Sequence, residues 1–120
     1  MVDVEIPRIR TVCELNDHSH WRARFKRSQD QKIRVLAALR RTVVGQMMVL
    51  APLDVTLTRI APSAGLDVGD NLPSSQKFVR DQVAAMLGID DRDPRVRWHY
   101  AQERGEWGVR IRIEPAATLA

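Results

Sequence analysis

The chain has 120 residues, which suits one domain, and its 44% hydrophobic and 28% charged residues suit a globular core with a hydrated surface. The formal net charge is +4 and the pI is near 10.0, so a polyanionic partner such as nucleic acid fits the charge. A single cysteine, Cys13, excludes an intrachain disulfide, which favours a reducing compartment. No apolar run reaches the ~20 residues that are needed to cross a bilayer. We therefore expect one cytoplasmic domain over residues 1–120 with no membrane contact.

The first half of the chain predicts a strand and a helix. Val2–Ile9 is rich in β-branched residues and is expected to be a strand or extended arm. A polar stretch over residues 16–27 follows. Ser28 is the expected N-cap of a helix that runs to about Val44, with Asp30 near the positive end of its dipole.

The second half predicts three strands and one long helix. In chain order these are a strand over Asp54–Ile60, a loop over 61–69, a helix over Asn71–Leu87 that stops at Gly88, strands over Val96–Gln102 and Trp107–Ile113, and a flexible tail from about residue 115 to 120. The order strand, helix, strand, helix, strand, strand predicts an α+β fold, a small mixed sheet with two main helices packed on one face.

Four aspartates flank the second predicted helix. Asp67 and Asp70 precede it, and Asp90 and Asp91 follow it. Hard cations such as Mg²⁺ bind carboxylate oxygens, and phosphodiester hydrolysis uses them to generate hydroxide and to stabilise charge. A helix of this length spans about 24 Å, so the four aspartates can form a single metal site only if the loops fold back along the helix or the helix is shorter. The alternative is that Asp70 only places charge at the N-terminus of the helix, and that Asp90 and Asp91 are solvated loop residues.

Lys77 and Asp81 lie one turn apart on the same predicted helix. As an i,i+4 pair on the surface they need no function. The functional alternative is that Lys77 contacts the scissile phosphate beside the metal.

The polar stretch before the first helix interleaves cations with aromatic rings. Basic side chains beside an aromatic ring fit phosphate contact combined with stacking on bases, and the alternative is a solvated loop whose aromatic residue packs on the core. His18 and His20 are too poorly spaced for a zinc site. The candidate nucleic-acid contacts are Asn16, His20, Trp21, Arg22, Arg24, Lys26 and Arg27.

Taken together, the aspartates, the Lys77–Asp81 pair and the basic stretch occur in an order and spacing that resemble those of a known family. The matching pieces are Leu15-Asn16 with His20-Trp21-Arg22, Asp70-Asn71, Lys77 with Asp81, and Leu87-Gly88-Ile89-Asp90-Asp91 before the strand Val96–Gln102. Over about residues 4 to 114 the chain resembles RusA-like Holliday-junction resolvases, in particular a divergent group associated with bacteriophage and prophage genomes. Two spacings differ from the family: Val68 and Gly69 both separate the first two aspartates, and Leu72–Gln76 separate Asn71 from Lys77.

The resemblance implies a Mg²⁺-dependent endonuclease, with Mn²⁺ as a possible substitute, that acts as a homodimer on branched DNA without a small-molecule cofactor. It implies that Asp70 and Asp91 hold the metal together with Asp67, which stands for the family's first aspartate, and that Asp90 supports them. It also implies that Lys77 acts at the phosphate and that Asn71 lies beside the DNA. The alternatives are a non-catalytic DNA-binding protein of the same fold and a protein-interaction module that binds no nucleic acid.

Overall fold

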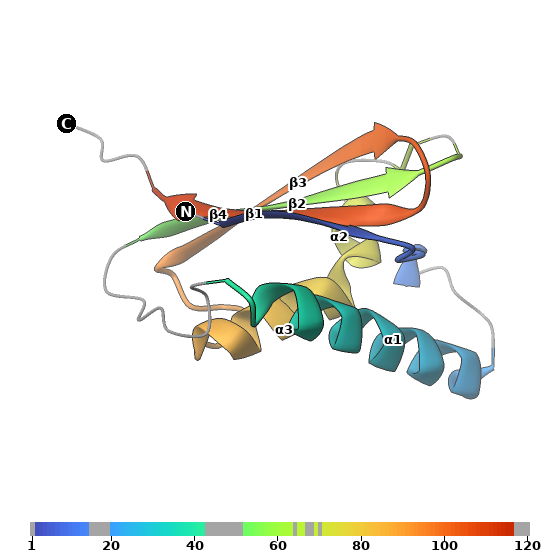
Figure 1. The fold of residues 1–120 in the computed structure, drawn as a ribbon, viewed down its shortest axis with the longest axis horizontal. Coiled ribbons are helices and arrows are strands. Elements are labelled where there is room, and N and C mark those ends of the chain that lie inside the picture. The colour runs from blue at the N-terminus through green and yellow to red at the C-terminus, as the bar shows by residue number, and fades with distance from the viewer. Residues whose placement is uncertain are drawn as a thin grey trace.

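Four strands form one mixed sheet in the order β1-β4-β2-β3 (Figure 1). A computed structural model describes residues 2–14, 20–42, 52–63, 65–66, 69 and 71–116. The strands are β1 (Val2–Pro7), β2 (Leu53–Ala61), β3 (Val96–Arg104) and β4 (Gly108–Pro115). β2 and β3 run parallel, whereas β4 is antiparallel to both β1 and β2. The predicted α+β fold and its mixed sheet are confirmed, with strand ends shifted by a few residues.

The first helix, α1 (Trp21–Leu39), begins earlier than the sequence pattern indicated. The prediction that it starts at Ser28 is wrong, because the His20 side chain caps the helix by accepting a hydrogen bond from the Arg22 amide at 3.2 Å. Asp30 therefore lies in the middle of the helix and pairs with Arg34, 3.0 Å away and one turn later. The predicted helix end near Val44 is wrong, because α1 already ends at Leu39 and the Thr42 amide donates to the Leu39 carbonyl at 2.9 Å in the turn that follows. The last four residues of the predicted tail lie outside the described residues.

The second predicted helix is two helices, α2 (Asn71–Ser75) and α3 (Lys77–Leu87), separated at Gln76. The prediction of one continuous helix is wrong at this residue. Gln76 is fully buried, and among the described residues neither its side-chain nitrogen nor its oxygen has a hydrogen-bond partner. An unsatisfied buried amide costs about 1–3 kcal/mol. Gly88 ends α3 in the left-handed region at φ 72°, as expected for a C-terminal glycine.

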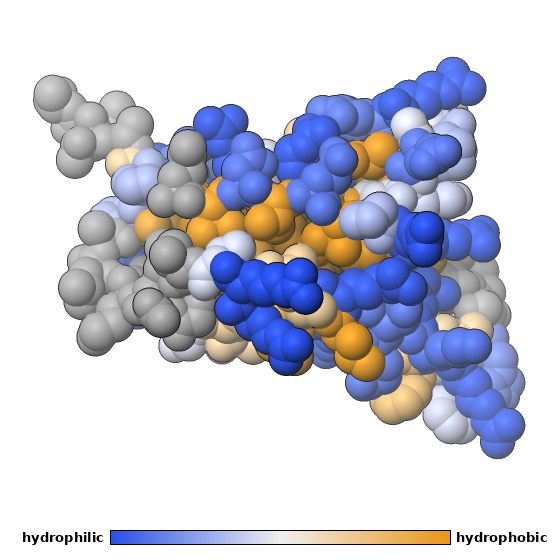
Figure 2. Space-filling view, in the orientation of Figure 1, coloured by the Kyte–Doolittle hydropathy of each residue, from blue (hydrophilic) through white to orange (hydrophobic). Residues whose placement is uncertain are grey.

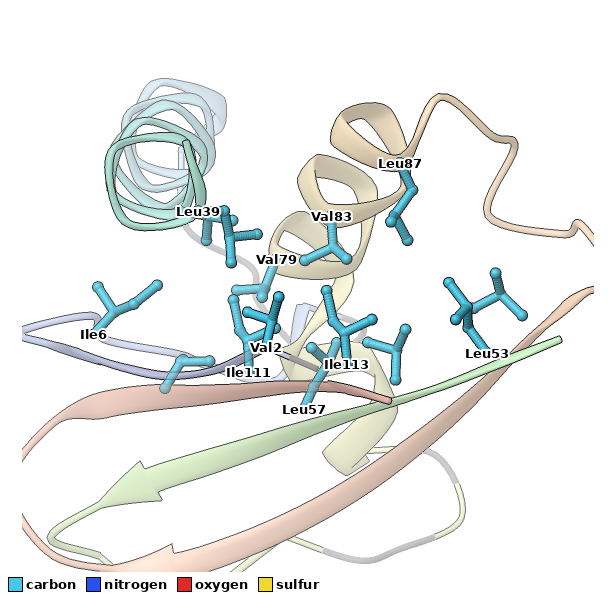
Figure 3. Packing of buried hydrophobic residues seen from close by; sticks show 14 of the residues in the cluster. Val2, Ile6, Leu39, Leu53, Leu57, Val79, Val83, Leu87, Ile111 and Ile113 are labelled. Carbon is cyan, nitrogen blue, oxygen red and sulfur yellow. The ribbon is translucent and has the colours of Figure 1, made fainter. Parts of the chain in front are cut away.

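α1 and α3 lie side by side on one face of the sheet, as predicted (Figure 1). Val79 and Val83 of α3 and Leu39 of α1 point toward the sheet, where they meet strand residues that include Leu57, Ile111 and Ile113 (Figure 3). In the space-filling view hydrophobic residues form a band between the sheet and the helices (Figure 2). The core therefore fixes the backbone of α3, and with it the positions from which the side chains of its exposed side extend.

The other face of the sheet carries charged side chains that pair across strands. Arg110 of β4 bridges Glu5 of β1 and Glu103 of β3 at 2.9 and 2.6 Å. These two carboxylates raise the pKa of Arg110, and Arg110 lowers the pKa of Glu103. This face is polar, in agreement with the alternation of each strand. Within the described residues, none of the helices has the length and apolar character to cross a lipid bilayer.

Candidate active site

A cavity of about 640 Å³ lies beside α3 and brings together charged residues from distant parts of the sequence. Its acidic lining residues are Glu14, Asp81 and Asp91. Its basic lining residues are Arg24, Lys77, Arg80 and Arg92. The segment before α1, all three helices, and the loop after α3 contribute. A concave site with converging charges of both signs is the usual setting for catalysis or ligand binding.

Lys77 and Asp81 face this cavity from the first turns of α3. Their Nζ and Oδ2 atoms lie 3.7 Å apart, so the i,i+4 pair predicted from the sequence is formed. Half of the Lys77 side chain is exposed, at 53%. An exposed pair of this kind contributes only about 0.3–0.5 kcal/mol, so it can open to release Lys77 toward an anion at little cost.

Asp91 is fixed by its backbone. Its carbonyl oxygen accepts a hydrogen bond from Arg80 Nη2 at 2.7 Å and another from Trp98 Nε1 at 3.0 Å. Its carboxylate lies 3.5 Å from Arg80 Nε. Arg80 is itself held by Tyr100, whose hydroxyl accepts from Nη1 at 2.6 Å, and by stacking at 4.7 Å over the Trp98 ring. Because Arg80 lies near the start of α3, the loop after Gly88 must fold back along the helix to reach it.

The rest of this loop is ordered by its own side chains. Asp90 accepts a hydrogen bond from the Arg92 amide at 2.8 Å, and its carboxylate does not line the cavity. Asp93 accepts hydrogen bonds from the Arg95 side chain and amide, which lower the pKa of Asp93 to about 2. The loop therefore holds Asp91 at the cavity and Asp90 away from it.

Arg80 provides the first testable consequence of this arrangement. Hydrogen bonds from a charged donor contribute about 1.5–3 kcal/mol, so Arg80→Met is expected to lower the free energy of unfolding by about 2 kcal/mol. It should also speed amide hydrogen exchange at residues 91–93. The control is Arg92→Met, an exposed cation at the same cavity, which should stay within about 0.5 kcal/mol of wild type. Equal effects of the two substitutions would show that Arg80 does not hold the loop.

The segment before α1 is held beside the cavity by contacts of Cys13 with α2 and of Glu14 with α1. Cys13 Sγ donates to Asn71 Oδ1 at 3.0 Å, so this segment touches the start of α2. Glu14 is only 3% exposed and receives two guanidinium nitrogens of Arg27 at 2.6 to 2.8 Å. Of the predicted nucleic-acid contacts, Arg27 is thus engaged in a buried ion pair.

The other predicted contacts that the structure describes before and within α1 lie at its first two turns and are exposed. They are His20, Trp21, Arg22, Arg24 and Lys26. Trp21 and Phe25, one turn apart, are 65% and 59% exposed. The alternative in which Trp21 packs on the core as part of a loop is wrong, because residues 21–27 are helical and project the ring into solvent. Phe25, Glu14 and Arg80 were not among the candidate residues.

Half of the predicted metal ligands can be located. Asp90 and Asp91 are described, whereas Asp67, Asp70 and Asn16 lie outside the described residues. Among those described, no three His, Cys, Asp or Glu side chains cluster as metal ligands would. Asp81 and Asp91 line the same cavity, and carboxylate oxygens are of the hard type that Mg²⁺ binds. Comparison with protein-family models, curated proteins and solved structures finds no match to this chain.

Proposed function

We propose that the chain is a Mg²⁺-dependent, structure-selective DNA endonuclease that cuts branched DNA such as Holliday junctions, in the manner of the RusA-like resolvases that its motifs resemble. One observation carries the proposal. Lys77, Asp91 and Arg24 belong to three separate motifs of the sequence, and all three line a single cavity. A carboxylate that can hold a metal ion, with a lysine and an arginine that can contact phosphate oxygens, supports metal-assisted attack on a phosphodiester.

The roles follow from the chemistry of each group. Asp91, with Asp67 and Asp70 from the sequence motif, would hold Mg²⁺, which supplies a hydroxide at neutral pH and stabilises charge on the phosphate. Lys77 would leave its exposed pairing with Asp81 to contact a non-bridging phosphate oxygen. Arg24 would contact the DNA backbone from α1.

We propose further that two chains act together. A Holliday junction is nearly two-fold symmetric, and its resolution needs two nicks. One chain offers one aspartate set, so a two-fold homodimer would supply both.

A second function is favoured by a specific observation. Asp81 and Asp91 each lie beside a cation of the same chain, Lys77 and Arg80, at 3.7 and 3.5 Å. Carboxylates neutralised in this way lose affinity for a metal ion. The alternative is therefore a DNA-binding protein that binds the same junctions without cutting them.

Cleavage of a four-way junction tests the proposal. Purified protein with Mg²⁺ or Mn²⁺ is expected to nick the junction at symmetric positions and to leave linear duplex of the same sequence largely intact. Light scattering of the same sample should show a dimer, with or without DNA. Junction binding without nicking in either metal would select the binding protein, and a salt-insensitive or absent gel shift would exclude both functions.

A further inference from the structure

Two arginines approach the same indole ring at the end of the sheet. The Cζ atoms of Arg10 and Arg59 lie 5.6 and 5.4 Å from the centre of the Trp107 ring. Trp107 lines a cavity of about 470 Å³ together with Arg8, Arg10, Pro62 and Glu106. We refer to Arg8, Arg10 and Trp107 as the Arg–Trp cleft; Arg59 contacts the same ring but does not line this cavity. It is distinct from the candidate active site, because the described residues that line the two cavities are different.

The positive charge of the cleft has little compensation nearby. Arg59 is 5% exposed, and its guanidinium donates to Thr11, to Oγ1 at 3.1 Å and to the carbonyl at 3.5 Å. Within the part of the chain that the structure describes, no carboxylate forms an ion pair with Arg8, Arg10 or Arg59, although Glu106 lines the same cavity. Arg8 and Arg10 are exposed, so their guanidinium groups are open to a ligand, whereas Arg59 is buried and already donates to Thr11. Exposed guanidinium groups without a carboxylate partner favour an anion.

The backbone of the cleft is held in position before any ligand arrives. The Arg8 amide donates to the Trp107 carbonyl at 2.8 Å, and Arg8 adopts φ 64°, a left-handed conformation that residues other than glycine rarely take. The carbonyl of Arg10 accepts from Nε2 of the buried Gln31 at 2.9 Å. Strained backbone that the surrounding structure enforces is concentrated at ligand sites, and pre-organised cations lose less freedom when they bind.

We propose that the Arg–Trp cleft binds a phosphate group of the DNA backbone, as a second contact beside the candidate active site. Guanidinium groups are the side chains best matched to phosphate oxygens. The cleft and the active site are joined by one short segment, because Arg10 and Glu14 are four residues apart and so at most about 14 Å apart when extended. One DNA strand could therefore contact both sites. The DNA source of the phosphate rests on the proposed function.

Salt dependence of junction binding tests the DNA contact. Each phosphate contact contributes about 0.9 to the slope of log K against log salt for duplex DNA. Arg10→Gln and Arg8→Gln are both substitutions of exposed residues, and each is expected to reduce that slope by about 0.9 and to weaken binding several-fold. The control is Arg40→Gln, an exposed arginine at the far end of α1, which changes the net charge equally and should leave the slope unchanged. Equal slopes for Arg10→Gln and Arg40→Gln would overturn the DNA contact.

Inorganic phosphate tests the cleft separately from DNA. Thermal unfolding is measured in phosphate and in chloride at matched ionic strength, for wild type, Arg10→Gln and Arg40→Gln. The general stabilisation by phosphate is common to all three proteins, so a larger phosphate shift in wild type and Arg40→Gln than in Arg10→Gln supports an anion site. If this difference is found but the protein binds no DNA, the proposed function fails and the cleft takes free phosphate. No difference among the three overturns the cleft as an anion site.

Discussion

Asp91→Asn is expected to reduce Mg²⁺-dependent nicking of a four-way junction to less than about one hundredth of the wild-type rate. Even partners in the outer shell of a metal site typically change affinity or activity about 10–100-fold when they are replaced, and a direct ligand is expected to exceed that. Junction binding should persist, because the substitution keeps the backbone carbonyl of residue 91 that Arg80 and Trp98 hold. The measurements are single-turnover cleavage and a gel shift without metal.

The adjacent aspartate provides a matched control. Asp90→Asn removes the same charge one residue earlier, and its amide oxygen can still accept from the Arg92 amide as the carboxylate does. Since Asp90 does not line the cavity, this variant should cut at near the wild-type rate. If both variants lose cleavage equally, the effect comes from the loop charge rather than from a ligand at Asp91. If neither loses cleavage, Asp91 has no part in catalysis.

The strands and the core could be predicted from the sequence because their signal is local. Val55 and Leu57 alternate with polar residues along β2, and alternation of this kind indicates one buried face whatever surrounds it. Gly88 likewise marked the end of α3. The start of α1 could not be predicted in this way. Trp21 and Phe25 have helical spacing, but they are a single apolar pair among basic residues and both are exposed, so the first two turns show no apolar stripe of the kind that packs on a core.

The break at Gln76 has only a weak local signal. Glutamine is a good helix former, although Pro73, Ser74 and Ser75 directly before it are residues that favour turns. The break coincides with full burial of the Gln76 side chain, which has no hydrogen-bond partner among the described residues. It matters for the site, because it makes Lys77 the first residue of α3.

The candidate site was only partly predictable for the same reason. Lys77 and Asp91 were predicted from the spacing of sequence motifs, but nothing in the sequence indicated that the loop after Gly88 folds back to meet Arg80. Because of this loop, Asp91 contacts a residue near the start of α3, although it follows the end of that helix in the sequence. Glu14 could not be foreseen, because its role depends on Arg27, 13 residues later in the sequence.

Arg27→Met is expected to destabilise the protein by about 3 kcal/mol at neutral pH. The substitution leaves the Glu14 carboxylate, 3% exposed, buried without its cation, and breaking a buried ion pair in this way typically costs about 3–5 kcal/mol. The cost should lie at the lower end of this range because Arg27 is itself 17% exposed, so water can reach part of the site. The measurement is urea unfolding followed by circular dichroism.

Two further variants separate this effect from loss of helix charge. Arg34→Met removes an arginine from the same helix, where it forms an exposed i,i+4 pair with Asp30, and should cost no more than about 0.5 kcal/mol. The double variant Glu14→Met with Arg27→Met removes both charges and should recover most of the loss, because apolar replacements of buried pairs are often neutral or stabilising. A double variant as unstable as Arg27→Met would mean that the arginine acts through packing. Glu14 also lines the candidate active site. Weaker junction binding by the double variant would therefore show that this ion pair shapes the cavity for DNA, in addition to holding the N-terminal segment to α1.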